Sequence, residues 1–164
     1  MKNQIIDIGK KSRKAFSIQL NSKKKNKVLM DYSKLLVKSK DEILNENKKD
    51  IKNAIRKRFK NNLIQRLILD EKKIINMSNS IREIIKLKDP TNIILENWQR
   101  PNGLNISKVS IPIGIIGVIY ESRPNVTSDI ASLCFKSGNP VILKGGSESF
   151  YSNNILSKLF RKSL

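Results

Sequence analysis

Histidine is absent from the 164 residues of this chain, and cysteine occurs once, at Cys134. Without histidine, the chain lacks the commonest general acid–base group and the commonest metal ligand. A single cysteine excludes a disulfide within the chain. Aromatic residues make up only 5% of the sequence, and it contains neither the aromatic signature of RNA-binding modules nor a zinc-finger spacing.

Long apolar runs are missing as well. No segment resembles a signal peptide and none is long enough to span a membrane, so the sequence predicts a cytoplasmic protein with no membrane partner. The G-x-G-x-x-G fingerprint of standard dinucleotide-binding folds is also absent, and K-G-G-S at 144–147 does not match the G-x-x-x-x-G-K-[ST] phosphate loop. A nucleotide site in this chain therefore needs a different kind of loop.

Acidic residues are scarce: 14 Asp and Glu stand against 33 Lys and Arg, which gives a formal net charge of +19. One interpretation is a protein that binds nucleic acid or an anionic membrane. The other is a biased coding composition, because lysine, asparagine and isoleucine are all abundant. The lysines are scattered, and the densest run (23–25) lies where a helix is expected to begin. We therefore favour the second interpretation and predict no nucleic-acid partner, although the charge can still attract anionic substrates and cofactors.

The first ninety residues carry four apolar stripes with the i, i+3, i+4, i+7 spacing of amphipathic helices. The stripes contain Ile5, Ile8, Ser12, Ala15 and Phe16; then Val28, Leu29, Tyr32, Leu35 and Leu36; then Ile43, Leu44, Asn47, Ile51, Ala54 and Ile55; and finally Ile74, Met77, Ile81, Ile84 and Ile85. Ser39 and Glu42 form a capping box that predicts the start of the third helix. Asp70 is the expected cap of the fourth helix, which is expected to end at Asp89-Pro90.

After residue 90 the pattern changes to short extended segments. Two of them, 93–100 and 104–112, flank Pro101-Asn102-Gly103, and Asn-Gly between such segments predicts a β-hairpin. The β-branched run 113–120 predicts a strand buried on both faces. The sequence then predicts, in order, a loop at 121–125, a helix at 126–136 that ends with Gly138 in the left-handed conformation, a strand at 140–143, a loop at 144–148 and a helix at 150–164.

The order strand–helix–strand–helix predicts an α/β fold with parallel strands, a right-handed crossover and helices on both faces of the sheet. Two parallel strands with both edges open are half of a doubly wound domain, so we expect a truncated chain. Ligands of such sheets bind outside the carboxyl ends of the strands. The loops 121–125 and 144–148 follow those ends, and we expect them along one common rim.

Several segments carry a family resemblance. The stretch 111–127, I-P-I-G-I-I-G-V-I-Y-E-S-R-P-N-V-T, is similar to the signature of the gamma-glutamyl phosphate reductase (glutamate-5-semialdehyde dehydrogenase) family, and 131–139 and 141–148 continue it. Upstream, 44–50 resembles the family's Leu-x-x-Asn-x-x-Asp helix, and 66–69 resembles its Arg-Leu-x-Leu turn.

The resemblance implies an aldehyde-dehydrogenase-like subunit with a cofactor domain, a catalytic domain and an oligomerisation element. Residues 1–90 would be a helical segment that packs on the cofactor domain, 91–112 the oligomerisation hairpin, and 113–164 the first βαβα part of an NADP-binding domain. The catalytic domain and its nucleophilic cysteine have no counterpart here, so the chain alone is expected to be inactive.

The implied reaction is the second step of proline biosynthesis. A cysteine thiolate attacks L-glutamyl 5-phosphate, phosphate leaves, and NADPH delivers a hydride to the thioacyl intermediate to give L-glutamate 5-semialdehyde; covalent catalysis of this kind splits one hard step into two easier ones. The resemblance further implies a homo-oligomer when full length, and glutamate 5-kinase as the neighbouring enzyme of the pathway.

Asn125 matches the asparagine whose amide stabilises the oxyanion in this superfamily; the alternative is an asparagine that satisfies a turn after Pro124. Arg123 could clamp the substrate's phosphate or carboxylate, or could equally pair with Glu121. Cys134 lies within a predicted helix on an apolar face, and we interpret it as a structural residue rather than as the nucleophile.

Lys144 matches a lysine that contacts the adenosine ribose of the cofactor or its 2′-phosphate; the alternative is an ordinary solvated lysine. Gly145, Gly146, Ser147 and Glu148 complete this predicted cofactor loop. Glu148 suits the ribose hydroxyls but would repel a 2′-phosphate, so a preference for NADPH requires nearby cations or a Glu148 side chain that turns away.

Three other functions remain open on sequence alone. The chain could belong to another acyl-phosphate or aldehyde dehydrogenase of the same superfamily. It could be a basic nucleic-acid-binding or interaction module, which would show binding that falls steeply with salt. It could also be a truncated pseudo-enzyme that pairs with an intact subunit.

Overall fold

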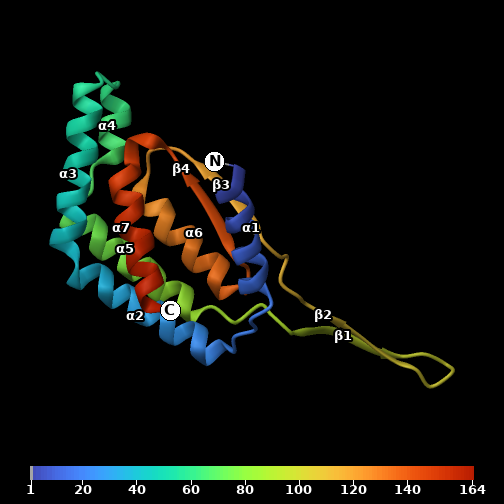
Figure 1. Cartoon of the computed structure of the whole chain (residues 1–164). Coiled ribbons are helices and arrows are strands. Elements are labelled where there is room, and N and C mark those ends of the chain that lie inside the picture. Colours follow the sequence, from blue (N-terminus) through green and yellow to red (C-terminus); the bar gives the residue numbers. More distant parts are fainter. Residues whose placement is uncertain (1) are drawn as a thin grey trace.

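The computed structural model describes residues 2–164 and consists of a helical body, a small parallel sheet and a protruding hairpin (Figure 1). The helices are α1 (Lys2–Phe16), α2 (Ser22–Lys38), α3 (Lys40–Arg56), α4 (Asn61–Leu67), α5 (Glu71–Lys86), α6 (Pro124–Lys136) and α7 (Phe150–Ser163), with a short 3-10 turn η1 (Ser147–Ser149). The strands are β1 (Ile94–Gln99), β2 (Asn105–Val109), β3 (Ile116–Tyr120) and β4 (Val141–Gly145).

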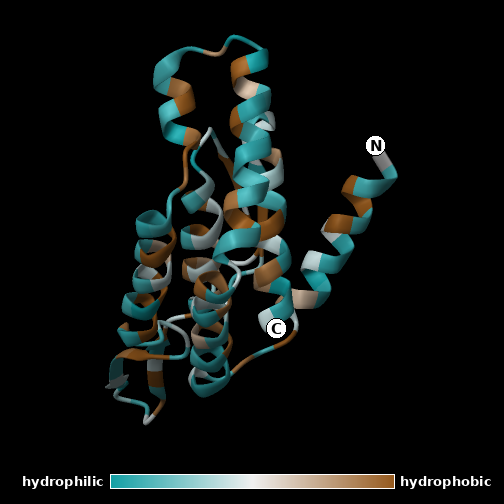
Figure 2. Cartoon of the chain, turned by 90° about the vertical axis from the view of Figure 1, so that its left-hand side faces the viewer, coloured by the Kyte–Doolittle hydropathy of each residue, from teal (hydrophilic) through white to brown (hydrophobic). Residues whose placement is uncertain are grey.

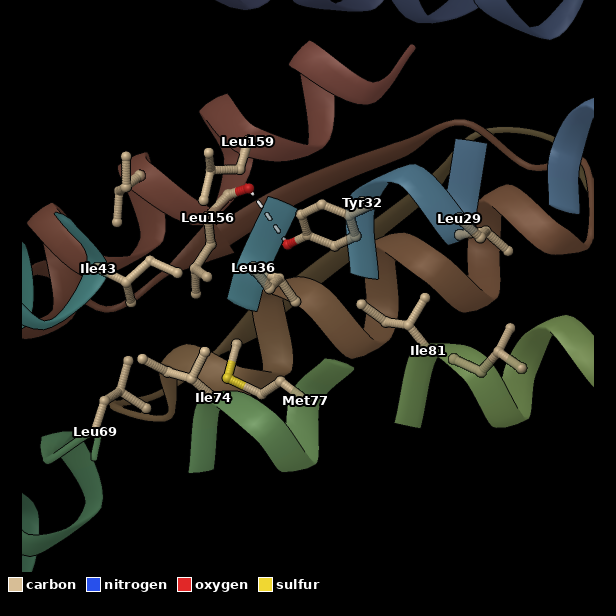
Figure 3. Packing of buried hydrophobic residues seen from close by; sticks show 12 residues of the cluster. Leu29, Tyr32, Leu36, Ile43, Leu69, Ile74, Met77, Ile81, Leu156 and Leu159 are labelled. Atoms are coloured by element: carbon tan, nitrogen blue, oxygen red, sulfur yellow. Dashed lines mark hydrogen bonds between the residues drawn. The ribbon is translucent and has the colours of Figure 1, made fainter. Parts of the chain in front are cut away.

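The hydrophobic core lies among α2, α3, α5 and α7 (Figure 3). Three of the four predicted apolar stripes, those of α2, α3 and α5, supply most of its residues. Tyr32 is the largest of them, and its hydroxyl donates a hydrogen bond of 3.3 Å to the carbonyl oxygen of Leu156 on α7. Because burial of each large apolar side chain is worth about 1.5–3 kcal/mol, this cluster is the main source of stability in the described chain.

Two buried polar residues of α3 tie α7 and the end of α4 to the bundle. The Asp50 carboxylate accepts hydrogen bonds from the backbone amides of Tyr151 (3.1 Å) and Ser152 (2.8 Å), so it caps the first turn of α7 from another helix. Asn47 accepts from the amide of Leu69 (2.9 Å) and donates to the carbonyl of Leu67 (2.8 Å). The Leu-x-x-Asn-x-x-Asp segment is therefore a structural clamp.

The predicted helix ends are only partly correct. Asp70 caps α5 as expected, by accepting from the amide of Lys73 at 2.6 Å. The predicted start of the third helix is correct, since Ser39 is the residue that precedes α3, but the capping box itself does not form. The Ser39 side chain makes no capping bond, because this residue also closes α2 and its backbone (φ −99°, ψ 21°) is not extended. Helix α5 stops at Lys86, before the predicted Asp89-Pro90. Asp89 instead binds the buried Lys25 amino group at 3.0 Å.

Two features of the first ninety residues differ from expectation. The segment 66–69, expected as a turn, contains the last residues of the short helix α4. Helix α1 forms as predicted, but its apolar stripe does not enter the core: Ile5 is 67% exposed, and the helix lies at the edge of the molecule (Figure 2). An amphipathic pattern thus identified the helix without identifying a partner for its apolar face.

The predicted hairpin is confirmed. Strands β1 and β2 pair antiparallel with Trp98 opposite Ile106, and Gly103 at the turn has φ +86°, which favours glycine. The hairpin extends away from the body, and all of β1 is exposed (Figure 1).

Strands β3 and β4 are parallel, as predicted, with Tyr120 opposite Gly145 at their carboxyl ends. Strand β3 begins at Ile116 rather than at 113, because Gly114 adopts φ +127° and its amide is bound by the Asn139 side chain. The prediction that β3 is buried on both faces is wrong for this chain. Helix α6 packs against one side of the sheet. On the other side α1 contacts β4, but Ile119 of β3 is 87% exposed.

Candidate functional site

The segments that follow β3 and β4 lie at the same edge of the sheet. Because the strands are parallel and end in register, the predicted common rim is formed, and the Ser122 hydroxyl donates a hydrogen bond of 2.7 Å to Oε1 of Glu148 across it. This bond joins residues 26 positions apart and holds the two segments together at the place where α/β sheets bind ligands.

Side chains pack closely against the backbones of the two glycines of the rim. A Cβ on Gly145 would lie 2.3 Å from Nδ2 of Asn153 and 3.0 Å from the Tyr120 ring. A Cβ on Gly146 would lie 2.0 Å from Oε1 of Glu148, since the glutamate folds back over this residue. The glycine pair thus allows β4, α7 and the Glu148 carboxylate to pack at one corner.

A chain of hydrogen bonds fixes the rim to the two helices behind it. Thr127 on α6 donates its single hydroxyl hydrogen to Oδ1 of Asn153 (2.9 Å), so the Tyr120 hydroxyl, 2.6 Å away, must be the donor to Thr127. Asn153 donates to Ser149, which in turn donates to the carbonyl of Gly146. Burial raises the pKa of Tyr120 even though the bond to Thr127 lowers it, so the phenol keeps its proton at neutral pH.

The predicted cofactor-loop residues divide between strand and turn. Lys144 and Gly145 belong to β4 rather than to a loop, and the Lys144 side chain is exposed opposite Ile119 on the open side of the sheet. Ser147 is exposed in η1. Glu148 turns toward Ser122, which leaves Lys144 and Ser147 as the exposed polar groups of this segment.

Asn125 lies in the first turn of α6, because this helix begins at Pro124 instead of 126. Its side chain does not satisfy a turn, as the alternative interpretation required. Instead, its amide nitrogen donates to Oδ2 of Asp129, one helical turn further along, at 3.2 Å. A primary amide has two N–H groups, so this bond orients Asn125 and uses one of them.

Next to Asn125 is an open hollow of about 280 Å³ between the end of α4, α5 and α6. Its polar lining consists of Arg66, Lys73, Asn76, Ser80, Asn125 and Asp129. Oδ1 of Asp129 is buried and has no hydrogen-bond partner within the described chain. Burial raises the pKa of Asp129, and the bond from Asn125 only partly opposes this.

The sequence interpretation missed the charged residues of this hollow. Arg66 was noted only within a family turn, and Asp129 not at all; the one signal was the i, i+4 spacing of Asn125 and Asp129 on α6. Arg123, for which a substrate contact and a pair with Glu121 were equal alternatives, is exposed and is not part of the lining. Its alternative partner, Glu121, lies 3.7 Å from Arg66 instead.

Cys134 lies on the core side of α6 and is 8% exposed, and burial raises the pKa of its thiol. A buried thiol with a raised pKa is poorly reactive, which favours the interpretation of Cys134 as a structural residue. Among residues 2–164, no three His, Cys, Asp or Glu side chains gather in a way that could hold a metal ion. None of the helices in the same range is long and apolar enough to cross a membrane.

Comparison with known proteins gives a consistent result, although no family model matches. The chain is 50% identical over 145 residues to gamma-glutamyl phosphate reductase of Nautilia profundicola. The aligned region covers 88% of this chain and 35% of that protein. It is 48% identical over 162 residues to the protein of the same name from Leptospira interrogans, and this alignment covers 98% of this chain and 39% of that protein. The chain thus spans little more than a third of the length of these curated relatives.

Solved structures agree. The crystal structure of gamma-glutamyl phosphate reductase from Thermotoga maritima matches with a TM-score of 0.94 and 37% identity over 97% of this chain and 39% of that one. The Saccharomyces cerevisiae protein of the same name matches with a TM-score of 0.88 and 30% identity, over 96% of this chain and 40% of that one. A putative aldehyde dehydrogenase from Bacillus subtilis, at 15% identity and a TM-score of 0.71, shares the fold. The predicted aldehyde-dehydrogenase-like fold is therefore confirmed.

Proposed function

We propose that this chain, a homologue of the gamma-glutamyl phosphate reductases, forms the cofactor-binding side of an enzyme that reduces L-glutamyl 5-phosphate with NADPH. The products are L-glutamate 5-semialdehyde and phosphate, in the second step of proline biosynthesis, in the cytoplasm and downstream of glutamate 5-kinase. The observation that carries the proposal is the rim held by Ser122 and Glu148, with Asn125 and a charged hollow at the first turn of the helix that follows β3.

The exposed groups of the rim fit the adenosine end of a nicotinamide nucleotide. Lys144 offers a cation and Ser147 a hydroxyl to a 2′-phosphate, while Glu148, held by Ser122 through one carboxylate oxygen, keeps the other for a ribose hydroxyl. The glutamate is folded back over Gly146, which limits its repulsion of a 2′-phosphate, and Lys144 would supply the compensating positive charge. When bound, the nucleotide supplies the hydride.

Asn125 is proposed to stabilise the oxyanion that forms when the acyl group is attacked. Its bond to Asp129 fixes the side-chain amide, and its second N–H remains available as a neutral donor. A donor that is already oriented needs no reorganisation as negative charge develops. Loss of one such donor typically costs roughly two to three decades in rate.

The hairpin β1–β2 is proposed as an oligomerisation element of the full-length enzyme. It projects from the body, and Trp98, 42% exposed, provides an aromatic anchor of the kind enriched in interfaces. Replacement of Trp98 by Asp is expected to reduce the assembly to smaller species in analytical ultracentrifugation, whereas an unchanged sedimentation coefficient would contradict this role.

The test of the function uses a full-length enzyme that contains this chain. We expect phosphate-dependent reduction of NADP⁺ in the presence of glutamate 5-semialdehyde, and a protein without this activity would refute the proposal. Asn125→Ala should lower kcat about 100- to 1,000-fold. Lys144→Gln should raise KM for NADP⁺ more than for NAD⁺, whereas Lys48→Gln, an exposed lysine on α3, should change neither.

A further inference from the structure

Asp129 has a property that the proposed reaction does not use. Its Oδ1 is one of two buried side-chain polar atoms without a hydrogen-bond partner among residues 2–164, the other being the hydroxyl oxygen of Ser132. A buried carboxylate oxygen is strongly disfavoured unless a donor satisfies it, so an unpaired one needs an explanation. Asp129 also lines the hollow beside Asn125, so a small rotation of its side chain would bring Oδ1 within reach of a donor there.

The hollow places opposite charges on different walls. Arg66 comes from α4 and Lys73 from α5, and they face it together with Asp129 of α6. The Lys73 amino group donates to the carbonyl of Ile68 at 2.6 Å, whereas Arg66 has only a 3.7 Å contact between its Nη1 and the exposed Glu121. The five N–H groups of its guanidinium therefore leave Arg66 with donors for a ligand. A volume of about 280 Å³ corresponds to roughly nine water molecules at about 30 Å³ each, which suits a small zwitterion.

We propose that Asp129 binds the α-ammonium group of an amino-acid substrate in this hollow, while Arg66 binds its α-carboxylate. The proposal rests on the function proposed above and adds the basis of selectivity for an amino acid over a simple acyl chain. The torsion about the Cβ–Cγ bond of Asp129 is broad, so a partial rotation of the carboxylate would turn its unpaired oxygen to the ligand. An ammonium group also supplies the donor that Asp129 lacks.

The spacing along α6 agrees with this arrangement. In a glutamyl group four bonds separate the α-nitrogen from the 5-carbon, and at about 1.5 Å each they extend over about 5 Å. The four residues from Asn125 to Asp129 rise about 6 Å along the helix axis, at 1.5 Å each. A ligand anchored at Asp129 can therefore place its reacting carbonyl near the Asn125 amide, and the 3.2 Å bond between the two side chains keeps their separation fixed.

The test compares two probes that differ only in the ammonium group: L-glutamate 5-methyl ester and glutaric acid monomethyl ester. Each is titrated into the isotope-labelled 164-residue chain, and the dissociation constants are measured from NMR chemical-shift changes. We expect the amino-acid ester to bind about tenfold more tightly or better, as a charge-assisted hydrogen bond predicts. Asp129→Asn should abolish this preference and leave the affinity for the glutarate ester unchanged.

Two further variants separate the charges. Arg66→Gln should weaken both probes to a similar extent, because both carry the carboxylate. Asp41→Asn, an exposed aspartate on α3, removes the same charge elsewhere and should preserve the preference. Circular dichroism spectra confirm that each variant is folded.

Equal binding of the two probes, no binding of either, or a preference that survives in Asp129→Asn would overturn the proposal. These outcomes leave the proposed function intact, since that is judged by phosphate-dependent NADP⁺ reduction in the full-length enzyme. Conversely, absence of that activity together with a selective hollow would refute the function and keep the ammonium site.

Discussion

Replacement of Asn47 by alanine tests whether the clamp between α3, α4 and α7 stabilises the fold. Asn47 is 1% exposed and makes three hydrogen bonds: to the carbonyl of Leu67 at 2.8 Å, to Oγ of Ser152 at 2.9 Å and from the amide of Leu69 at 2.9 Å. Alanine removes all three and leaves a buried carbonyl and a buried amide without partners. The effect is therefore larger than that of an exposed asparagine.

The magnitude follows from the number of bonds. Each is worth about 1 kcal/mol net, so we expect a loss of about 3 kcal/mol in the free energy of unfolding. For a chain of this size that loss corresponds to a fall in Tm of roughly 6–12 °C. Asn45→Ala is the matched control, because Asn45 is exposed on the same helix and the change in helix propensity is identical.

Urea denaturation followed by circular dichroism measures both variants against the wild type. The difference between Asn47→Ala and Asn45→Ala isolates the buried hydrogen bonds. If the two variants unfold within about 0.5 kcal/mol of each other, the range expected for an ordinary surface substitution, the clamp contributes nothing and the reasoning is refuted.

Three further outcomes are expected. Gly145→Ala should destabilise the chain by about 1–3 kcal/mol in urea denaturation through the clash at its Cβ, whereas Gly117→Ala in β3, where a Cβ meets open space, should be tolerated; equal effects would contradict the close packing of the rim. Partial burial would raise the pKa of Asp89, but hydrogen bonds from its neighbours, Lys25 included, hold this pKa below 3.8. The contribution of Asp89 to the free energy of unfolding is therefore present above pH 3.8 and is lost as the pH falls through the lowered pKa. Asp89→Asn should flatten that part of the stability–pH curve, and an unchanged curve would count against the pair. Because burial raises the pKa of Cys134, iodoacetamide should label it slowly in the native chain and rapidly in denaturant, and equal labelling rates would show that it is accessible.

The elements that sequence predicts best are those whose pattern is both periodic and long. The apolar stripes predicted α2, α3 and α5, and each of these helices has one buried face. The apolar segments at 113–120 and 140–143 predicted two parallel strands, and β3 and β4 pair in this way. The stripe of α1 is as regular as the others, yet it is exposed. Periodicity reports which residues share a face, but it does not report what that face meets.

The site was less predictable for the same reason. The rim followed from the rule that parallel strands end at one edge, and it appears as expected. The hollow needs Arg66 and Lys73, which come from the consecutive helices α4 and α5, together with Asp129 of α6, more than fifty residues further along the chain. A single aspartate on a helix carries no pattern of its own, so its unpaired oxygen becomes visible only in three dimensions.

The cap that Asp50 places on α7 has a consequence for synthesis on the ribosome. Asp50 and the amides it holds are 101 and 102 residues apart, and α7 contributes Ile155, Leu156 and Leu159 to the core. At roughly 5–20 residues per second, about 5–20 seconds pass between translation of α3 and that of the helix it caps. During this interval the apolar faces of α2 and α5 lack the cover that α7 provides, so the nascent chain exposes surface to which a chaperone can bind.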